Sequence, residues 1–98
     1  KVDFAVIGAS ALDEDGAILD HDSREVSVAR AILRNARSKI LLCDGSKFSR
    51  SAPVRICGIS DIDVLVTDTP PPAPFLDAAR AAGTRILTLD KNESREND

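Results

Sequence analysis

Residues 41–48, LLCDGSKF, join a run of apolar side chains directly to an acid, a glycine, a hydroxyl and an amine. Short apolar runs without polar–apolar alternation are typical of strands covered on both faces, as in a parallel sheet. Polar groups that follow such a strand lie at its carboxyl end, which is where open parallel sheets bind ligands. The stretch therefore predicts a parallel sheet with a candidate site at its edge.

The strand before this turn is expected at residues 39–44, and three similar apolar runs occupy residues 3–8, 63–68 and 85–89. Helical patterns separate some of these runs, and alternation of strands with helices indicates βαβ units. We therefore expect an α/β fold with an open, mostly parallel sheet, flanking helices and a Rossmann-like arrangement.

The first helix is expected over residues 23–37, because Asp22 and Glu25 resemble a capping box at its start. An apolar stripe at helical spacing predicts its buried face. The stripe consists of Val28, Ala29, Ile32, Leu33 and Ala36. The opposite side carries Ser27, Arg30, Arg34 and Arg37. We expect that side to be solvated, although arginines can also bind phosphate.

A second helix is expected after the prolines of residues 69–74, with Gly83 as its C-terminal cap. Its buried face is predicted to contain Phe75, Leu76, Ala79 and Ala82. The long connection at residues 9–21 contains an Asp15-Gly16 turn signal, which predicts a short hairpin arm at residues 17–19. A short edge strand is expected within residues 50–59.

Composition limits the class of protein. The chain has 98 residues, enough for one domain, and its net charge of -3 gives no general reason to bind nucleic acid. It contains neither an apolar run long enough to span a membrane nor a signal-peptide pattern. Cys43 and Cys57 lie in apolar runs, so we expect two buried free thiols and a reducing, cytoplasmic location. We expect no metal site and no cofactor.

The ends of the chain suggest a piece of a longer protein. It contains no methionine and begins with Lys1-Val2 immediately before an apolar strand. We therefore expect a fragment in which residues 1–89 form part of a domain and the polar residues 90–98 form a disordered tail.

Three predicted strand ends carry polar or small residues that could form a site. The first strand is followed by Gly8, Ala9 and Ser10, the second by Asp44, Gly45, Ser46 and Lys47, and the third ends in Thr67 and Asp68. A glycine permits close backbone approach, and a lysine offers a point charge for phosphate. The combination favours a small anionic ligand such as a sugar phosphate.

Each of these residues also has a simpler interpretation, and both stay open. Asp44 to Lys47 can be an ordinary turn in which the aspartate binds the backbone and the lysine is solvated. Glu25 can cap its helix or contact a ligand. Thr67 and Asp68 can mark only the end of a strand.

Four segments, taken in order, resemble the C-terminal effector domain of DeoR-family transcriptional regulators, a sugar-phosphate sensor. They are residues 3–18 (DFAVIGASALDEDGAI), 24–33 (REVSVARAIL), 40–48 (ILLCDGSKF) and 59–68 (ISDIDVLVTD). The resemblance covers residues 2–89, and the last two segments are distinctive as a pair. It implies a fold similar to those of ribose-5-phosphate isomerases and coenzyme A transferases.

The resemblance also implies a function. That function is the one of a non-enzymatic repressor module whose inducer would be a phosphorylated sugar or a sugar-derived metabolite. DNA would be bound only through an N-terminal winged helix outside this chain. Lys47 would contact phosphate, Asp44 and Ser46 would frame the turn with Gly45, and the same cleft would be lined by Gly8, Ala9, Ser10 and Glu25. The alternative is a sugar-phosphate isomerase, with Glu25 as the base that moves the proton.

The sequence departs from the family pattern in ways that carry further expectations. Ala29 replaces a usual lysine and Ala11 a common glycine, and the lost lysine argues against isomerase activity. The family's Ser-Gly-Thr-Thr phosphate loop would lie before Lys1. We therefore expect weak or no ligand binding by this chain alone, and a homo-oligomer formed through strand edges or helix faces.

A phospho-acceptor module of the receiver type is a third hypothesis. Asp44, Thr67 and Lys91 follow successive strands, as such a site requires. The first strand, however, ends in Gly8 and Ala9 rather than in an acidic pair for magnesium, so this hypothesis is the least favoured.

Overall fold

The computed structural model describes residues 1–89, so the predicted tail at residues 90–98 lies outside it. Within this range the strands are β1 (Val2–Ile7), β2 (Ala11–Leu12), β3 (Ala17–Asp20), β4 (Ala36–Cys43), β5 (Val54–Gly58), β6 (Val64–Thr67) and β7 (Arg85–Thr88). The helices are α1 (Ser23–Arg34) and α2 (Ala73–Ala82), with short 3-10 helices η1 (Gly45–Ser49) and η2 (Ile59–Asp61).

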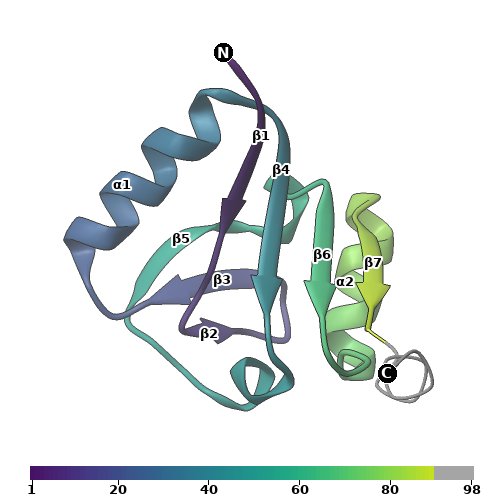
Figure 1. Cartoon of the computed structure of the whole chain (residues 1–98). Coiled ribbons are helices and arrows are strands. Elements are labelled where there is room, and N and C mark those ends of the chain that lie inside the picture. The colour runs from purple at the N-terminus through teal and green to yellow at the C-terminus, as the bar shows by residue number, and fades with distance from the viewer. Residues whose placement is uncertain (90–98) are drawn as a thin grey trace, which may run out of the picture.

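The main sheet has four parallel strands in the order β1-β4-β6-β7 (Figure 1). This confirms the predicted α/β class and each of the four predicted strands. β4 lies inside the sheet and pairs with β1 on one side and with β6 on the other. It begins at Ala36, three residues earlier than expected.

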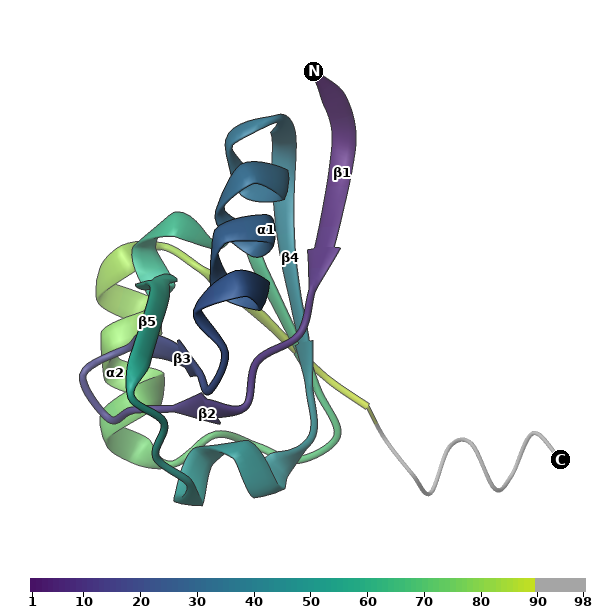
Figure 2. The same cartoon turned by 90° about the vertical axis from the view of Figure 1, so that its left-hand side faces the viewer.

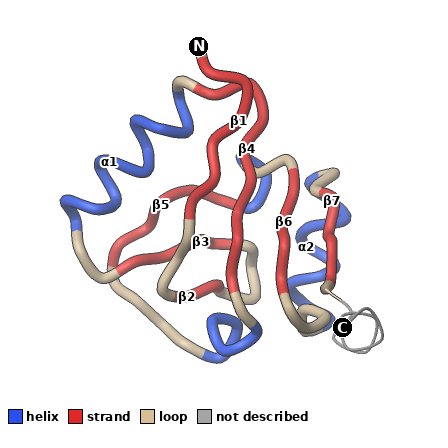
Figure 3. Tube along the Cα trace, viewed as in Figure 1, coloured by secondary structure: helices blue, strands red, loops and turns tan. Residues whose placement is uncertain are grey.

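A second, smaller sheet was predicted only in part. The expected hairpin forms β2 and β3, and β5 adds to it in antiparallel fashion (Figure 3). Gly16 adopts a φ of 92°, and a Cβ at this position would lie 2.7 Å from Cγ2 of Ile59. The Ile59 N–H donates to the carbonyl of Gly16 at 2.7 Å. The hairpin turn is therefore fixed against η2 by close backbone contact.

Helix α1 is shorter and rotated relative to the prediction. It begins at the predicted Asp22 cap but ends at Arg34, where the Asn35 side-chain amide donates to the carbonyl of Ala31 at 2.8 Å. Val26 and Leu33 are buried, whereas the predicted core residues Val28 and Ile32 are exposed. The predicted stripe is thus wrong for Val28 and Ile32.

Arg30 connects α1 to the second sheet. Its guanidinium donates from Nε to the carbonyl of Ile56 at 3.0 Å and from a terminal nitrogen to the carbonyl of Arg55. Both acceptors belong to β5, so Arg30, although exposed, links the helix to the second sheet.

Both helices and the second sheet lie on one side of the main sheet (Figure 2). The core between these layers contains the fully buried Ile18, Leu41, Leu65 and Phe75. The ring of Phe48 on η1 meets Phe75 edge-on, with centroids 5.1 Å apart. Burying each such side chain contributes about 1.5–3 kcal/mol.

The other side of the main sheet is bare within residues 1–89, in contrast to the predicted burial on both faces. Phe4, Val6 and Leu42 are 67%, 58% and 53% exposed. Val6 pairs with Ile40 and Leu42 with Val66, so these side chains share one face. The sheet therefore presents a continuous apolar surface.

Thr84 and Thr67 are both buried threonines, but within residues 1–89 only the side-chain hydroxyl of Thr84 has hydrogen-bond partners. Oγ1 of Thr84 lies 2.9 Å and 2.8 Å from the carbonyl oxygens of Ile59 and Ile62. Thr84→Val removes the donor, so we expect the free energy of unfolding to fall by about 1–3 kcal/mol in urea denaturation. Thr67→Val is the matched control and should leave stability unchanged or slightly raised. Equal losses in both variants would contradict this account.

Candidate functional site

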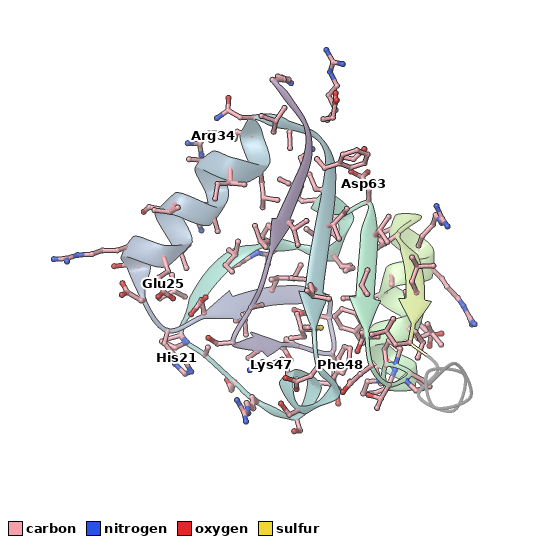
Figure 4. All side chains as sticks on the ribbon, viewed as in Figure 1. His21, Glu25, Arg34, Lys47, Phe48 and Asp63 are labelled. Atoms are coloured by element: carbon pink, nitrogen blue, oxygen red, sulfur yellow. The ribbon has the colours of Figure 1, made fainter. Side chains whose placement is uncertain are left out.

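The carboxyl ends of β1, β4 and β6 meet at one edge of the main sheet, around a hollow of about 460 Å³. Figure 4 shows Lys47 at the lower end of the molecule, where these strand ends lie. The hollow, which we call the Lys47 hollow, is lined by Gly8, Ala9, Leu42, Cys43, Asp44, Lys47, Thr67, Asp68 and Leu89. Four of the eight predicted site residues, namely Gly8, Ala9, Asp44 and Lys47, are therefore brought together here.

Asp44 shapes the turn that carries Lys47. One of its carboxylate oxygens, Oδ1, accepts from the backbone N–H of Ser46 at 2.9 Å and from the Ser46 hydroxyl. These bonds, the hydroxyl first, lower the pKa of the Asp44 carboxyl below its ordinary value of 3.8. Asp44 thus caps η1, as its Asx-turn interpretation predicted, and it also lines the hollow.

Gly45 is required by close packing between the two strand ends. Its N–H donates to Oδ1 of Asp68 at 2.7 Å. A Cβ here would lie 3.3 Å from Cβ of Thr69 and would overlap the Thr69 hydroxyl. The φ of Gly45 is not positive, so close approach rather than an unusual dihedral explains this glycine.

The remaining predicted residues lie outside the Lys47 hollow. The Ser10 hydroxyl donates to Oδ1 of Asp20 at 2.8 Å and so ties the start of the hairpin to its end. Glu25 lines a separate groove of about 490 Å³ between α1 and β1, together with Val6 and Ile32. Gly8 borders both spaces. Ser46 supports the turn through Asp44 and does not line the hollow.

Thr67, Asp68 and Cys43 line the hollow but were not among the predicted site residues. The signal for Thr67 and Asp68 was their place at the end of the third predicted strand. Burial raises the pKa of the Cys43 thiol to about 11, so the thiol is neutral at pH 7. The neighbouring Thr67 hydroxyl lowers that pKa, but the effect of burial is larger, and the two groups do not reach hydrogen-bond geometry.

Lys47 is the basic side chain among the residues that line the hollow. It is half-buried, and within residues 1–89 no carboxylate approaches it within ion-pair distance. Asp44 and Asp68 lie nearby, but each binds backbone N–H groups. The arrangement therefore offers one ammonium group to an anion beside carboxylate oxygens that can accept from hydroxyls.

Other classes of site were sought in the same range. The described residues contain no group of three or more His, Cys, Asp or Glu side chains suited to a metal ion. No helix in residues 1–89 has the length and apolar character needed to cross a membrane. Cys43 and Cys57 are both free thiols, as predicted, although Cys57 is only half-buried. Lys91 of the phospho-acceptor hypothesis lies outside the described residues.

The link between Ser46 and Asp44 can be tested by titration. Because the folded-state pKa of Asp44 is lowered, its ionised form stabilises the fold above pH 3.8, and this stabilisation is lost as the pH falls through the folded-state pKa. Ser46→Ala removes the largest cause and should raise the pKa of Asp44 toward its ordinary value. Carboxyl ¹³C shifts followed by NMR measure it, and Ser49→Ala is the control. An unchanged pKa in Ser46→Ala would contradict the hydrogen bond.

Comparison with known proteins places these features in a family. The chain is 44% identical to the glycerol-3-phosphate regulon repressor of Escherichia coli (strain K12) over 76 residues, which are 78% of this chain. It is 45% identical over 71 residues, 72% of the chain, to the repressor of the same name in Haemophilus influenzae. It is 33% identical over 87 residues, 89% of the chain, to the HTH-type transcriptional repressor CsqR of Escherichia coli (strain K12).

The matched region is 30%, 28% and 33% of the length of these three repressors, so the chain corresponds to about a third of each. Residues 1–69 match the model of the DeoR C-terminal sensor domain. This range includes β1, β4, β6 and the Asp44–Lys47 turn. This match covers more than two thirds of the chain and confirms the resemblance found in the sequence. The chain belongs to the DeoR C-terminal sensor domain family.

Proposed function

We propose that this chain is the effector-sensing part of a transcriptional repressor and that it binds a small phosphorylated metabolite in the Lys47 hollow. The observation that carries the proposal is the half-buried Lys47, which has no ion-pair partner within residues 1–89 and lines a hollow at the sheet edge. Two similar repressors are named for glycerol 3-phosphate. Glycerol 3-phosphate is therefore the first ligand to test, ahead of other sugar-derived phosphates.

In the proposed binding mode, the phosphate group and a hydroxyl group of the ligand contact different residues. The ammonium group of Lys47 contacts the phosphate, and the small residues Gly8 and Ala9 allow the ligand to approach the backbone. Asp44 is exposed and has one oxygen bonded to Ser46, so its other oxygen accepts from a ligand hydroxyl. Ligand binding would then be passed to DNA through a winged helix in a longer, cytoplasmic regulator.

The alternative, a sugar-phosphate isomerase, receives less support from the geometry. Isomerisation requires a carboxylate base close to the bound substrate. Glu25, the best candidate base, lines the groove between α1 and β1, whereas Lys47 lines the hollow at the strand ends. The two groups the reaction would combine therefore border different spaces.

Ligand binding can be measured by titrating ¹⁵N-labelled protein with glycerol 3-phosphate. We expect saturable shifts of the amides of residues 44–47 and 67–69, with an affinity in the millimolar range. Lys47→Ala removes one charge-assisted contact, so it should weaken binding by about tenfold or more. Arg80→Ala removes a charge from α2, outside the hollow, and is the matched control.

The same titration has outcomes that would overturn the proposal. Glycerol at equal concentration should give no saturable shift, because it lacks the phosphate. If glycerol gives the same shifts as glycerol 3-phosphate, or if Lys47→Ala and Arg80→Ala weaken binding equally, the Lys47 hollow is not the effector site.

We also propose that the bare face of the main sheet associates with a second copy of this chain. The face consists of Val2, Phe4, Val6, Ser38, Ile40, Leu42, Val64, Val66, Arg85 and Leu87. Arg85, at the edge in β7, is the single charged residue on it. Two such faces can therefore pack against each other as aligned sheets without burying like charges at their centre.

Self-association predicts a mass that increases with concentration in light scattering. Phe4→Lys places a charge near the centre of the exposed β1 side chains and should keep the protein monomeric. Val28→Lys is the control, since Val28 is 60% exposed but lies on α1 rather than on the sheet. A monomeric wild-type chain at millimolar concentration, or equal effects of both variants, would contradict this interface.

A further inference from the structure

A second charged cavity lies at the opposite end of β4 from Lys47. It has a volume of about 350 Å³ and is formed by residues of α1, β4, β5 and η2. Its basic residues are Lys1, Arg30, Arg34 and Lys39, and its one acidic residue is Asp61. The lining therefore has a formal charge of +3 in a chain whose net charge is -3. We call it the Lys39 cleft.

Lys39 is unusual because of the face on which it lies. It shares the inner face of β4 with Leu41 and Cys43, which are buried. Its backbone N–H donates to Oδ2 of Asp63 at 2.7 Å, which fixes the strand at this residue. The side chain is half-buried, and its ammonium group has no ion-pair partner in residues 1–89. A lysine that points inward without a carboxylate partner is expected to attract an anion.

Arg30 and Arg34 place two guanidinium groups on the helix wall of the same cleft. The carbonyl groups of Arg55 and Ile56 orient Arg30 but leave its positive charge unneutralised. Arg34 is in the last turn of α1 and has no ion pair within the described range. Figure 4 shows Arg34 at the upper end of the molecule and Lys47 at the lower end. The two cationic sites are therefore separate.

The rest of the cleft is apolar. Leu33 and Ile56 are both buried and contribute to its lining, so the charged groups surround an apolar floor. A cavity with one sign of charge above low-dielectric walls concentrates ions of the opposite sign. Its volume lies at the lower end of the range of about 300–1,000 Å³ typical of small-molecule pockets. A simple phosphate ion would use the charges but not the floor.

We propose that the Lys39 cleft is a second binding site, which takes a small organic phosphate. The phosphate group lies between Lys39 and Arg34, where an ammonium and a forked guanidinium can both donate to its oxygens. The apolar part of the ligand packs on Leu33 and Ile56. This site uses no residue of the Lys47 hollow, so it does not depend on the function proposed for that hollow.

The experiment uses ¹⁵N-labelled protein titrated with phenyl phosphate and, in parallel, with inorganic phosphate at constant ionic strength. We expect saturable amide shifts at Leu33 to Lys39 and at Ile56 and Cys57, with phenyl phosphate bound more tightly. The double variant Arg34→Ala with Lys39→Ala should weaken phenyl phosphate binding by about tenfold or more. Arg24→Ala with Arg80→Ala removes the same charge elsewhere and should change the affinity by less than about twofold.

Several results would overturn the proposal. Equal weakening by the two double variants would mean that net charge alone attracts the ligand. Shifts centred on residues 44–47 would assign the ligand to the Lys47 hollow, and equal affinity for the two phosphates would remove the role of the apolar floor. If the double variant loses amide dispersion, Arg34→Gln alone, at an exposed position, replaces it, with Arg24→Gln as its control.

Discussion

The parallel pairing of β4 with its two neighbours is the constraint on which the other features depend. Leu41, at the centre of β4, is fully buried, and the pairing of Cys43 with Thr67 brings the ends of β4 and β6 side by side. The Gly45 N–H can then reach Asp68, and the turn that follows places Lys47 over the strand ends. A shift of one residue in this register would turn Leu41 toward the exposed face and would separate these groups.

The segments that connect the strands of the main sheet explain why only one of its faces is covered. The connections that include α1, β5 and α2 all pack on the same face of the sheet, and this uses the apolar surface of the helices and of Ile18 and Phe75. The opposite face carries other apolar side chains of the same strands, yet no described residue covers it. These strand sequences are therefore typical of a sheet that is covered on both faces.

The sequence was sufficient for the strands but not for the orientation of α1. Uninterrupted apolar runs identify β1, β4, β6 and β7 because these strands carry apolar side chains on both faces of the main sheet. The face that α1 buries depends instead on its contacts with β5, which include the hydrogen bonds of Arg30 and which helical spacing cannot reveal. In the site, Lys47 and Gly8 both follow strand ends and line one hollow. Ser10 instead binds Asp20, which becomes adjacent to it only when the hairpin forms.

The two ends of β4 differ in a way that bears on ligand selection. At the Lys47 end, one ammonium group lies near the carboxylates of Asp44 and Asp68. Each of these carboxylates raises the pKa of the Cys43 thiol by more than Lys47 lowers it. The ligand proposed for that end would therefore present hydroxyl donors as well as an anion. At the Lys39 end, cations outnumber the single carboxylate and surround apolar side chains. The two proposed sites would thus select a polar and an apolar phosphate ester through the composition of the two ends of one strand.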